Sequence, residues 1–426
     1  MNIAVVGSGI SGLSAAWKLS LSGHEISLFE SNNYFGGHSN TFGVNIDGKE
    51  FGVDTGFLVF NNTNYPNFNN FLKKLKVQTV SSSMSFSVKI KKLSSLDDDD
   101  LEWSGSSIKT LFAQKKNLIN PQFIKMVKDV LKFNFLCNQF IENDSQFQQL
   151  TLEEFLFKNK LSKEFVDWYL LPMAGSIWSC SKNKILKFPI KTFLRFFYNH
   201  GLNKIFNRPK WQTIRGGSKN YVNKILPFIS KKYLNTPIKH INRILMNSNK
   251  LVQITTLDDI KFFDHVILAT HSDQSLNLID DINENEKKIL SAIKFQNNKA
   301  ILHTDENCLP KIKKLWSAWN YQGLEGDNEN ISVNYLINIL QPIPTKKSVI
   351  VSLNPNFKLD QEKIISTFNY SHPIFDYAAI EAQKSLSTIQ GNHNTWFVGA
   401  WTGYGFHEDG IKSGFNVADK INNLKN

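Results

Sequence analysis

Residues 3–12 read Ile-Ala-Val-Val-Gly-Ser-Gly-Ile-Ser-Gly, a short apolar run that passes directly into three spaced glycines. The run predicts a buried strand, residues 11–21 have helical spacing, and residues 25–30 again read as a buried strand. The first glycine permits a tight turn, the second lets backbone amides approach a phosphate, and the third allows close helix packing. The opening therefore predicts a βαβ unit that binds a dinucleotide at the N-terminus of its helix.

The residues that follow this unit favour one dinucleotide over another. Glu30 ends the second predicted strand, where a carboxylate can accept hydrogen bonds from both hydroxyls of a ribose. A second glycine pair, Gly36-Gly37, comes just after it and would let another loop cover a pyrophosphate. This second glycine pair favours FAD over NAD. The alternative is that the first glycine motif is only a turn of an α/β protein and binds no ligand.

Length and composition limit the class of protein. The chain has 426 residues, more than one hydrophobic core usually contains, so two domains are expected. Hydrophobic residues make up 41% and charged residues 20%, which excludes a wholly disordered chain. The net charge is +12, but the only arginines are Arg195, Arg208, Arg215 and Arg243. Because nucleic acids are read preferentially by arginine, this lysine surplus argues against a nucleic-acid partner.

Metal, disulfide and membrane-spanning features are not expected. The cysteines Cys137, Cys180 and Cys308 lie far apart without a CxxC pattern, and the acidic run 97–100 lacks the spacing of a calcium loop. We therefore predict no metal site. No secretory signal is recognised at the N-terminus, and no apolar run reaches the ~18–20 residues that span a bilayer. We expect a cytoplasmic location, with peripheral contact at the inner face of the membrane as a further hypothesis.

Two kinds of sequence pattern alternate along the chain. Residues 109–207 are helical and rich in aromatics. The glycine pair 216–217 and the apolar run 265–270 instead resemble the glycine turn and buried strand of the opening. A last buried strand at 395–400 precedes a glycine-rich loop and a final helix. We predict an α/β fold with ligands between two discontinuous domains: a dinucleotide-binding domain of residues 1–80, 205–275 and 390–426, and a substrate domain of residues 81–204 and 276–389 combining helices with a mixed sheet.

Motifs beyond the opening carry a family resemblance. Asp54–Phe57 forms an Asp-x-Gly turn, Arg215–Ser218 a glycine pair before a helix, and Phe397–Gly414 a strand, a glycine-rich loop and a helix start. Together with the two glycine loops they resemble the glutathione-reductase-like flavoproteins of the amine oxidase and phytoene desaturase superfamily. His38 stands where that superfamily most often has Arg or Lys. The resemblance implies a glutathione-reductase-like FAD-binding Rossmann domain.

A closer likeness rests on Gly36–Thr41, Asp54–Asn61, Trp178-Ser179, His372–Phe375 and Gly403–Gly410. These segments resemble a branch of bacterial amine-oxidase-like flavoproteins, often described as NAD/FAD-binding proteins, that is associated with cyclopropane-fatty-acid synthase-type methyltransferases. The resemblance implies FAD chemistry on a fatty-acyl lipid, such as desaturation of methylated chains on the way to furan fatty acids. A partner methyltransferase is implied in the same way.

The resemblance and the motifs together give a set of candidate site residues. Candidate cofactor-binding residues are Gly7, Gly9, Ile10, Ser11, Gly12, Glu30, Ser31, Gly36, Gly37, His38, Thr55, Gly56, Phe57, Gly399, Ala400, Glu408, Asp409, Gly410 and Ile411. A helix beginning at Gly410 would aim its amides at the N1/O2 edge of a flavin, although Asp409 and its neighbour could be ordinary N-cap carboxylates.

Candidate substrate-binding residues are the aromatic side chains Trp178, Trp319, Tyr321 and Trp401. No side chain stands out as an obligatory base, and the catalytic candidates are Tyr404, His407 and His372. We predict an FAD-dependent oxidoreductase that desaturates or oxidises a hydrophobic substrate by hydride transfer to flavin N5. An amine oxidase, a flavin-dependent isomerase and a non-catalytic FAD-bound partner of a lipid methyltransferase are the alternatives.

Two segments could contact a membrane. Residues 186–211 interleave Phe, Leu and Ile with Lys and Arg, and residues 123–141 are similar. Such an amphipathic stretch can lie among lipid headgroups. A helix that packs on the core with its lysines in water gives the same pattern, and the sequence leaves both interpretations open.

Overall fold

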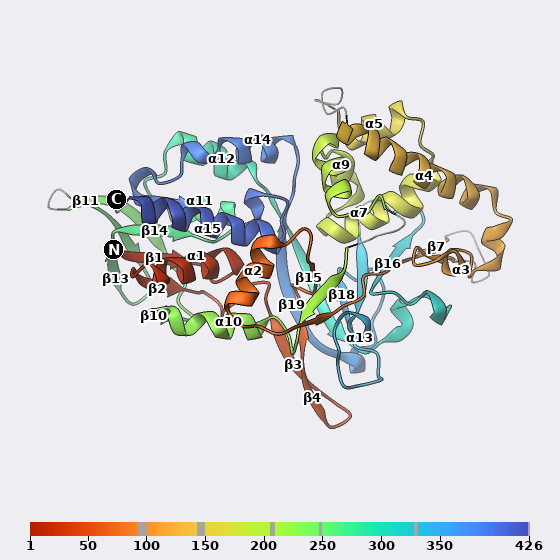
Figure 1. The fold of residues 1–426 in the computed structure, drawn as a ribbon, viewed down its shortest axis with the longest axis horizontal. Coiled ribbons are helices and arrows are strands. Elements are labelled where there is room, and N and C mark those ends of the chain that lie inside the picture. The colour runs from red at the N-terminus through yellow and green to blue at the C-terminus, as the bar shows by residue number, and fades with distance from the viewer. Residues whose placement is uncertain (93–99, 143–149, 205–208, 247–248, 328–330, 425–426) are drawn as a thin grey trace.

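The computed structural model describes residues 1–92, 100–142, 150–204, 209–246, 249–327 and 331–424 (Figure 1). A five-stranded parallel sheet, in the order β10-β2-β1-β14-β20, lies near both chain ends. Its strands are β1 (Asn2–Val6), β2 (Glu25–Phe29), β10 (Lys231–Tyr233), β14 (His265–Leu268) and β20 (Thr395–Phe397). They come from three separated parts of the chain, as the alternating sequence pattern predicts.

Each face of this sheet has its own hydrophobic core. One face packs against α1 (Ile10–Leu21), α2 (Pro66–Lys74), α10 (Lys219–Ile225) and α15 (His407–Asn423). The other face is covered by a three-stranded sheet and by helices, namely β11 (His240–Met246), β12 (Asn249–Thr255), β13 (Ile260–Phe263), α11 (Ser272–Leu278), α12 (Glu284–Ala292) and α14 (Tyr377–Ser385). Strands buried on both faces explain the continuous apolar runs of the sequence.

The first and last helices cross closely because glycines stand at the contact. A Cβ added to Gly410 would lie 2.7 Å from Ile10 Cγ2, and one added to Gly414 would lie 2.3 Å from Ser14 Oγ. A Cβ on Gly12 would lie 2.0 Å from the carbonyl oxygen of Gly7. A larger residue at Gly410 or Gly414 would push α15 away from α1, and one at Gly12 would push α1 away from the turn that precedes it.

The second part of the fold contains a seven-stranded mixed sheet in the order β19-β15-β18-β17-β16-β7-β8. Only the β7–β16 pair is parallel within these described strands. The strands are β7 (Phe86–Lys91), β8 (Leu101–Ser104), β15 (Phe295–His303), β16 (Trp319–Leu324), β17 (Ser332–Leu336), β18 (Ile350–Leu353) and β19 (Ile364–Pro373). This confirms the predicted α/β fold class with a mixed sheet in its second part.

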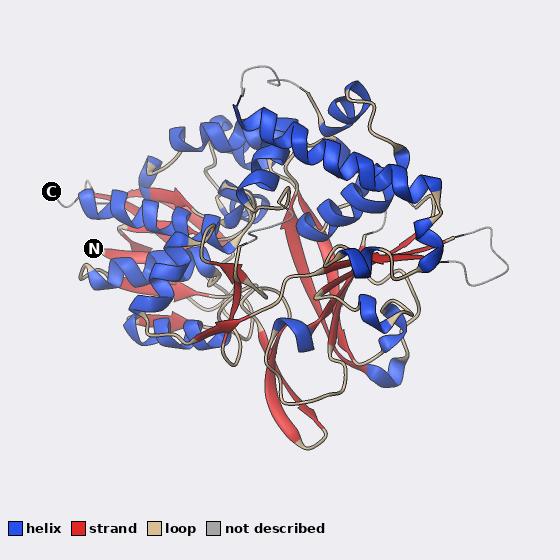
Figure 2. Ribbon diagram, turned by 45° about the vertical axis from the view of Figure 1, so that its right-hand side comes forward, coloured by secondary structure: helices blue, strands red, loops and turns tan. Residues whose placement is uncertain are grey.

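Helices from the continuous segment of residues 108–199 lie over this sheet (Figure 2). They are α3 (Ile108–Leu111), α4 (Pro121–Glu142), α5 (Leu152–Lys158), α6 (Lys163–Phe165), α7 (Leu171–Trp178), α8 (Lys182–Leu186) and α9 (Ile190–Asn199), with α13 (Ile337–Leu340) further along the chain. A hairpin of β3 (Thr41–Ile46) and β4 (Lys49–Asp54) projects from the body (Figures 1 and 2). A small sheet has the strand order β5-β9-β6 and comprises β5 (Phe60–Asn61), β9 (Trp211–Ile214) and β6 (Thr79–Ser81).

The two amphipathic segments differ in what their apolar faces contact. In α9 the side chains of Phe193, Phe196 and Phe197 are at most 2% exposed, so this face packs in the core. Residues 205–208 of the same segment lie outside the described residues. In α4, Leu131 and Phe135 are instead 53% and 61% exposed. Within the described part of the chain, no helix has both the length and the apolarity to span a bilayer.

Two other sequence expectations can be placed. Cys137, Cys180 and Cys308 are free and buried, and burial raises the pKa of each thiol to about 12. The predicted acidic turn lies outside the described residues except for Asp100. No group of metal-ligating side chains is found among the described residues.

A buried carboxylate joins three distant segments. One oxygen of Asp54 accepts hydrogen bonds from the Ser218 amide (2.9 Å), the Ser218 hydroxyl (2.7 Å) and the Thr41 hydroxyl (2.6 Å). The other oxygen accepts from Gln341 Nε2 at 2.9 Å, and Gln341 Oε1 accepts from the Asp54 amide at 3.0 Å. Burial raises the pKa of Asp54 to about 6. The β3–β4 hairpin, the glycine turn before α10 and the segment after α13 are thereby tied together.

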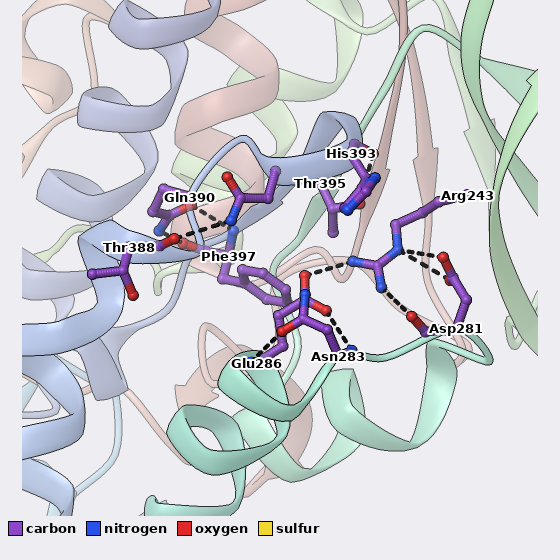
Figure 3. Close-up of polar contacts among 10 residues, drawn as sticks. Arg243, Asp281, Asn283, Glu286, Thr388, Gln390, His393, Thr395 and Phe397 are labelled. Atoms are coloured by element: carbon purple, nitrogen blue, oxygen red, sulfur yellow. Dashed lines mark hydrogen bonds and ion pairs between the residues drawn. The ribbon is translucent and has the colours of Figure 1, made fainter.

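A second polar cluster fastens β11 to α12 (Figure 3). Arg243 donates from Nε to the Asp281 carboxylate at 2.9 Å and from Nη1 to Glu286 Oε1 at 2.5 Å. The side chains of Arg243 and Glu286 are only 3% and 0% exposed. Glu286 also accepts from the Asn283 amide at 3.1 Å, so it caps α12 as well. The guanidinium is thus the cation that balances a fully buried carboxylate.

Replacing Arg243 by Met should lower the free energy of unfolding by about 3 kcal/mol, because Glu286 would stay buried without its cation. Urea denaturation followed by circular dichroism measures this loss. The matched control is Lys231→Met, which removes an exposed ion pair with Glu25 and should barely move the midpoint. Equal shifts for the two variants would contradict the structural role of Arg243.

Candidate active site

A cavity of about 550 Å³ lies where the parallel sheet meets the second part of the fold. Its lining includes residues within two positions of the ends of β1, β14 and β20, at the carboxyl ends of parallel strands. It also includes residues of α9, β16, β17 and β19. Ligands of open α/β sheets bind at this edge, so the cavity occupies the place that the βαβ opening predicts.

The two glycine loops meet at the N-terminus of α1. Gly7 has φ +100°, and an added Cβ there would lie 2.8 Å from the Ala269 carbonyl, so the turn needs glycine. Gly9 is the N-cap of α1 and has nothing within 4 Å of an added Cβ, which leaves it open to the cavity. A Cβ on Gly37 would lie 3.1 Å from Gly9 Cα. Two backbone loops therefore frame a helix N-terminus, the geometry that suits a phosphate group.

Glu30 organises the first of these loops. Its Oε2 accepts hydrogen bonds from the Ser8 amide (3.0 Å) and the Ser8 hydroxyl (2.5 Å). Its Oε1 accepts from the amide and the side chain of Asn32, both at 2.9 Å. The carboxylate also lines the cavity, where a ribose hydroxyl would share an oxygen with these donors or replace one of them. Glu30 is therefore placed both to shape the turn and to bind a sugar.

His38 follows Gly37 directly and lies in the cavity wall. Its ring centroid is 4.8 Å from that of Tyr370 and 5.1 Å from that of His372, both on β19. Its Nε2 atom is buried and has no hydrogen-bond partner in the described structure. Burial and the neighbouring histidines hold the pKa of His38 well below its usual value, so the ring is neutral at physiological pH.

His407 forms a different, closed arrangement at the start of α15. Its Nε2 lies 3.0 Å from the Ser39 hydroxyl and 3.3 Å from the Tyr221 hydroxyl, and its ring stacks on Phe57 with centroids 3.5 Å apart. Burial lowers the pKa of His407 to about 3. The ring is thus neutral and joins the second glycine loop, through Ser39, to α10 and α15.

The rest of the cavity is aromatic. We call it the aromatic chamber, and its walls are Phe196, Trp211, Trp319, Tyr335 and Phe406. The rings of Phe196 and Phe406 stack with centroids 5.1 Å apart, and those of Trp319 and Tyr335 meet edge to face at 5.2 Å. Among all described residues that line the cavity, Glu30 is the only one with a formally charged side chain. The chamber is therefore apolar and uncharged.

His200 supplies the chamber with one titratable ring. Its Nδ1 lies 3.0 Å from the Phe196 carbonyl oxygen, which can only accept, so Nδ1 carries the hydrogen and Nε2 is the acceptor. Burial lowers the pKa of His200 to about 4. The indole Nε1 of Trp319 is buried and has no partner in the described structure. His200 and Trp319 thus add an acceptor and a donor to a mainly aromatic wall that also contains the Tyr335 hydroxyl and the Trp211 indole.

Most of the sequence-predicted residues come together in this cavity. Those that line it are Gly7, Gly9, Ile10, Ser11, Glu30, Ser31, Gly37, His38, Gly56, Phe57, Trp319, His372, Gly399, Ala400, Trp401 and His407. His372 belongs to the wall beside His38, and its Nδ1 lies 2.7 Å from Asn298 Nδ2. The indole of Trp401 is fixed by donation to the Thr270 carbonyl at 3.1 Å.

Other predicted residues have contacts elsewhere. Glu408 accepts hydrogen bonds from the amides of Asn67 and Phe68, both at 3.0 Å, and so caps α2. The prediction that the last helix begins at Gly410 is wrong, because α15 begins at His407 with Phe406 as its N-cap. Asp409 lies in the first turn and accepts from the Phe406 amide at 3.0 Å, and burial raises its pKa to about 6.

Gly410 and Ile411 belong to the packing of α15 against α1, and Ile411 is fully buried in that core. Gly12 packs α1 against the Gly7 turn and Ala269. Gly36 packs against the Ser39 carbonyl, 2.7 Å from an added Cβ. The Thr55 hydroxyl lies 2.7 Å from the Tyr370 hydroxyl and so supports the cavity wall from behind.

Three aromatic candidates also lie outside the lining. Trp178 packs among Phe188, Phe193 and Phe196, with its ring centroid 4.6 Å from that of Phe196. Tyr321 is 1% exposed within the seven-stranded sheet. Tyr404 lies 6.0 Å from Phe196 between ring centroids, behind the chamber wall. Trp178 and Tyr321 therefore pack in the hydrophobic core and do not line the cavity.

Sequence reasoning missed several lining residues. Ala269 and Thr270 follow a strand that was recognised, and the rule that parallel strands end at the ligand would have included them. Phe196 and His200 lie in the segment read as amphipathic, and Tyr370 and Tyr335 lie on strands. These side chains carry no local motif, so only the fold brings them to the cavity.

Comparisons with known proteins support this geometry. A family model described as an NAD(P)-binding Rossmann-like domain matches residues 5–75. Over 40 residues the chain is 50% identical to a 4,4'-diapophytoene desaturase of Staphylococcus aureus, a stretch that spans 9% of this chain and only 8% of that enzyme.

Solved structures share the fold over almost the whole chain. A fatty acid isomerase from P. acnes, described as CLA-producing, is 16% identical with a TM-score of 0.67 and covers 99% of this chain and 98% of its own. Cyclohexylamine oxidase from Brevibacterium oxydans IH-35A is 12% identical with a TM-score of 0.70, covering 100% and 99%. The chain therefore has the fold that these two enzymes share. This confirms the predicted fold class.

Within this amine-oxidase-like fold, Glu408→Ala tests whether its carboxylate serves α2 or a ligand. We expect a loss of about 1 kcal/mol in the free energy of unfolding, because two amides of the first turn of α2 lose their acceptor. The ratio of bound flavin to protein should stay unchanged. Glu30→Ala is the comparison, since it should lower that ratio, as read from the visible absorption spectrum. A flavin loss in Glu408→Ala would contradict the capping role.

Proposed function

We propose that this protein is an FAD-dependent oxidoreductase that acts on a hydrophobic, fatty-acyl substrate. The observation that carries the proposal is the continuity of one cavity from the glycine turns to the uncharged aromatic chamber. The turns suit a dinucleotide, and the chamber suits an acyl chain. The proposal therefore assigns the two halves of the cavity to cofactor and substrate.

The residues present fit FAD. The N-terminus of α1 has no side-chain cap, so its amides are available to a phosphate, and Gly9 leaves room above them. Glu30 lies where a ribose would need an acceptor. When bound, FAD would supply a hydride acceptor for the oxidation of a carbon–hydrogen bond.

The protein's own residues would bind and orient the two reactants. The chamber walls Phe196, Trp319 and Tyr335 would exclude water and hold an acyl chain through apolar contact. Neutral His200 presents Nε2 as a proton acceptor. His407 is committed to two hydroxyls, so its part is to hold the wall formed by Phe57.

The charge of the cavity favours an acyl chain over an amine. A protonated amine must be desolvated on entry, and the described chamber lining offers it no carboxylate. The fatty acid isomerase of the same fold makes a flavin-dependent isomerase the second candidate. A desaturase and an isomerase differ in product mass, because only the desaturase removes two hydrogens.

Anaerobic mixing with fatty-acyl lipids, including methyl-branched chains, should bleach the oxidised flavin absorption band. Mass spectrometry should then find a product about two mass units lighter than the substrate, as removal of a hydride and a proton requires. Trp319→Ala should slow bleaching at least about tenfold by removing a chamber wall, while Leu245→Ala, on an exposed side chain of β11, should not.

Amines provide the opposing test. Putrescine and cyclohexylamine should leave the flavin oxidised. Rapid bleaching by an amine and none by any acyl lipid would overturn the substrate assignment. A product of unchanged mass would select the isomerase instead.

The proposal extends to membrane contact through the outer face of α4. Leu131 and Phe135 are exposed on this face, and Phe157 of α5 is 87% exposed. Lys132 donates to the Asn159 carbonyl at 2.7 Å, which places the end of α5 beside this face. Exposed apolar side chains with lysines among them suit an anionic lipid surface.

The double variant Leu131→Ser/Phe135→Ser should reduce co-sedimentation with anionic liposomes several-fold, because it removes the apolar insertion. Wild-type binding should weaken as salt is raised, since screening shortens the reach of the lysines. Leu245→Ser is the control, because Leu245 is 72% exposed but lies on β11 at the opposite end of the molecule (Figure 1). An equal loss in both variants would count against a membrane role for α4.

A further inference from the structure

The cofactor half of the cavity lacks a fixed positive charge. A pyrophosphate carries two negative charges, and proteins commonly meet them with Arg or Lys. No Lys or Arg is found among the described residues that line this cavity. The partial charge of the α1 N-terminus, roughly half a unit, offsets only part of the two charges.

His38 is the basic group best placed to supply the rest. Its neighbour Gly37 packs against Gly9, 3.1 Å from an added Cβ to Gly9 Cα, so His38 lies beside the open N-terminus of α1. The His38 carbonyl accepts from the Phe57 amide at 2.7 Å, which fixes the backbone there. The buried Nε2 atom has no hydrogen-bond partner in the described structure, although buried polar atoms are rarely left so.

The groups around His38 do not satisfy this nitrogen. The Tyr370 hydroxyl is engaged with Thr55 Oγ1 at 2.7 Å and with Asn40 Nδ2 at 3.1 Å. His372 accepts from Asn298 Nδ2 at Nδ1, which leaves its Nε2 as a donor in the neutral ring.

The other titratable groups near His38 complete its surroundings. They are His271, which precedes α11 and stacks on Phe295, His407 on α15, and Glu30 at the first glycine loop. Burial lowers the pKa of each of the three neighbouring histidines, so no imidazolium repels a proton on His38 at neutral pH.

We propose that His38 takes up one proton when a pyrophosphate ligand binds, and that the resulting imidazolium is the cation that pairs with the pyrophosphate. The proposal rests on the proposed function only in naming FAD as the natural source of the pyrophosphate. The proton comes from solvent. Before binding, burial keeps the ring neutral, whereas an anion within about 4–6 Å favours the protonated ring. Cofactor affinity should therefore rise as the pH falls.

The direction in which Kd changes with pH follows from the uptake of this proton. The bound state holds one more proton than the free state at any pH between the two pKa values of His38, so Kd should increase up to about tenfold per pH unit on going from pH 6 to pH 8. Adenosine carries no phosphate and should bind without this dependence. ADP carries the pyrophosphate without a flavin, so it separates phosphate recognition from flavin recognition.

The test is isothermal titration calorimetry of the full chain, freed of flavin, with ADP and with adenosine near pH 7. The terminal phosphate of ADP itself titrates near neutral pH. Proton uptake is therefore taken as that of a variant minus that of His38→Arg, whose charge is permanent. Titration in buffers of different ionisation enthalpy should give wild type an uptake, so defined, of close to one proton for ADP and none for adenosine. His38→Gln should bind ADP at least tenfold more weakly than wild type at pH 6 and without this uptake.

Two further variants locate the proton. His372→Gln should retain the uptake, and His240→Gln, at an exposed position on β11, is the matched control that should behave as wild type. Binding of ADP by wild type without proton uptake would overturn the proposal, and so would undiminished uptake in His38→Gln. Uptake with ADP but no binding of FAD would refute the proposed function and leave the role of His38 standing.

Discussion

The buried carboxylate of Asp54 is the constraint on which the arrangement of the cavity depends. It receives hydrogen bonds from Thr41, Ser218 and Gln341, side chains and amides that belong to three separate segments. Thr55, Gly56 and Phe57 follow it directly, so the same carboxylate positions the turn that lines the cavity. Loss of these bonds would leave a buried charge unpaired and free the segments from one another.

Burial of uncharged groups sets the chemical character of the cavity. Its histidines stay neutral because desolvation outweighs any stabilisation of their protonated forms, as for His200 and His407. A chamber of this kind discriminates against charged ligands without any specific clash, since such ligands lose hydration and gain no partner. Because the described lining has no fixed positive charge, an anion that enters the cavity would raise the pKa of the neutral histidines beside it.

The fold could be predicted where a local motif has one structural solution. The glycine turn at Gly7–Gly12 required a strand before it and a helix after it, and Glu30 had its place at the end of the next strand. Glu408 could not be assigned in this way, because a carboxylate near a helix start can cap its own helix or one that folding brings beside it. Its partner, Asn67, is 341 residues away in sequence. Phe196, His200 and Tyr370 were missed for a related reason, since a residue's helix or strand pattern does not tell which cavity its side chain enters.

The crossing of α1 and α15 has a consequence for biosynthesis. Helix α1, near the start of the chain, packs against α15, near its end, and β14 pairs with β20 at the edge of the sheet. At translation rates of about 5–20 residues per second, the early strand and helix emerge tens of seconds before these partners exist. Their apolar faces are exposed on the nascent chain for that time. A chaperone that shields the N-terminal segment on the ribosome would therefore act at the stage when this protein is most prone to aggregate.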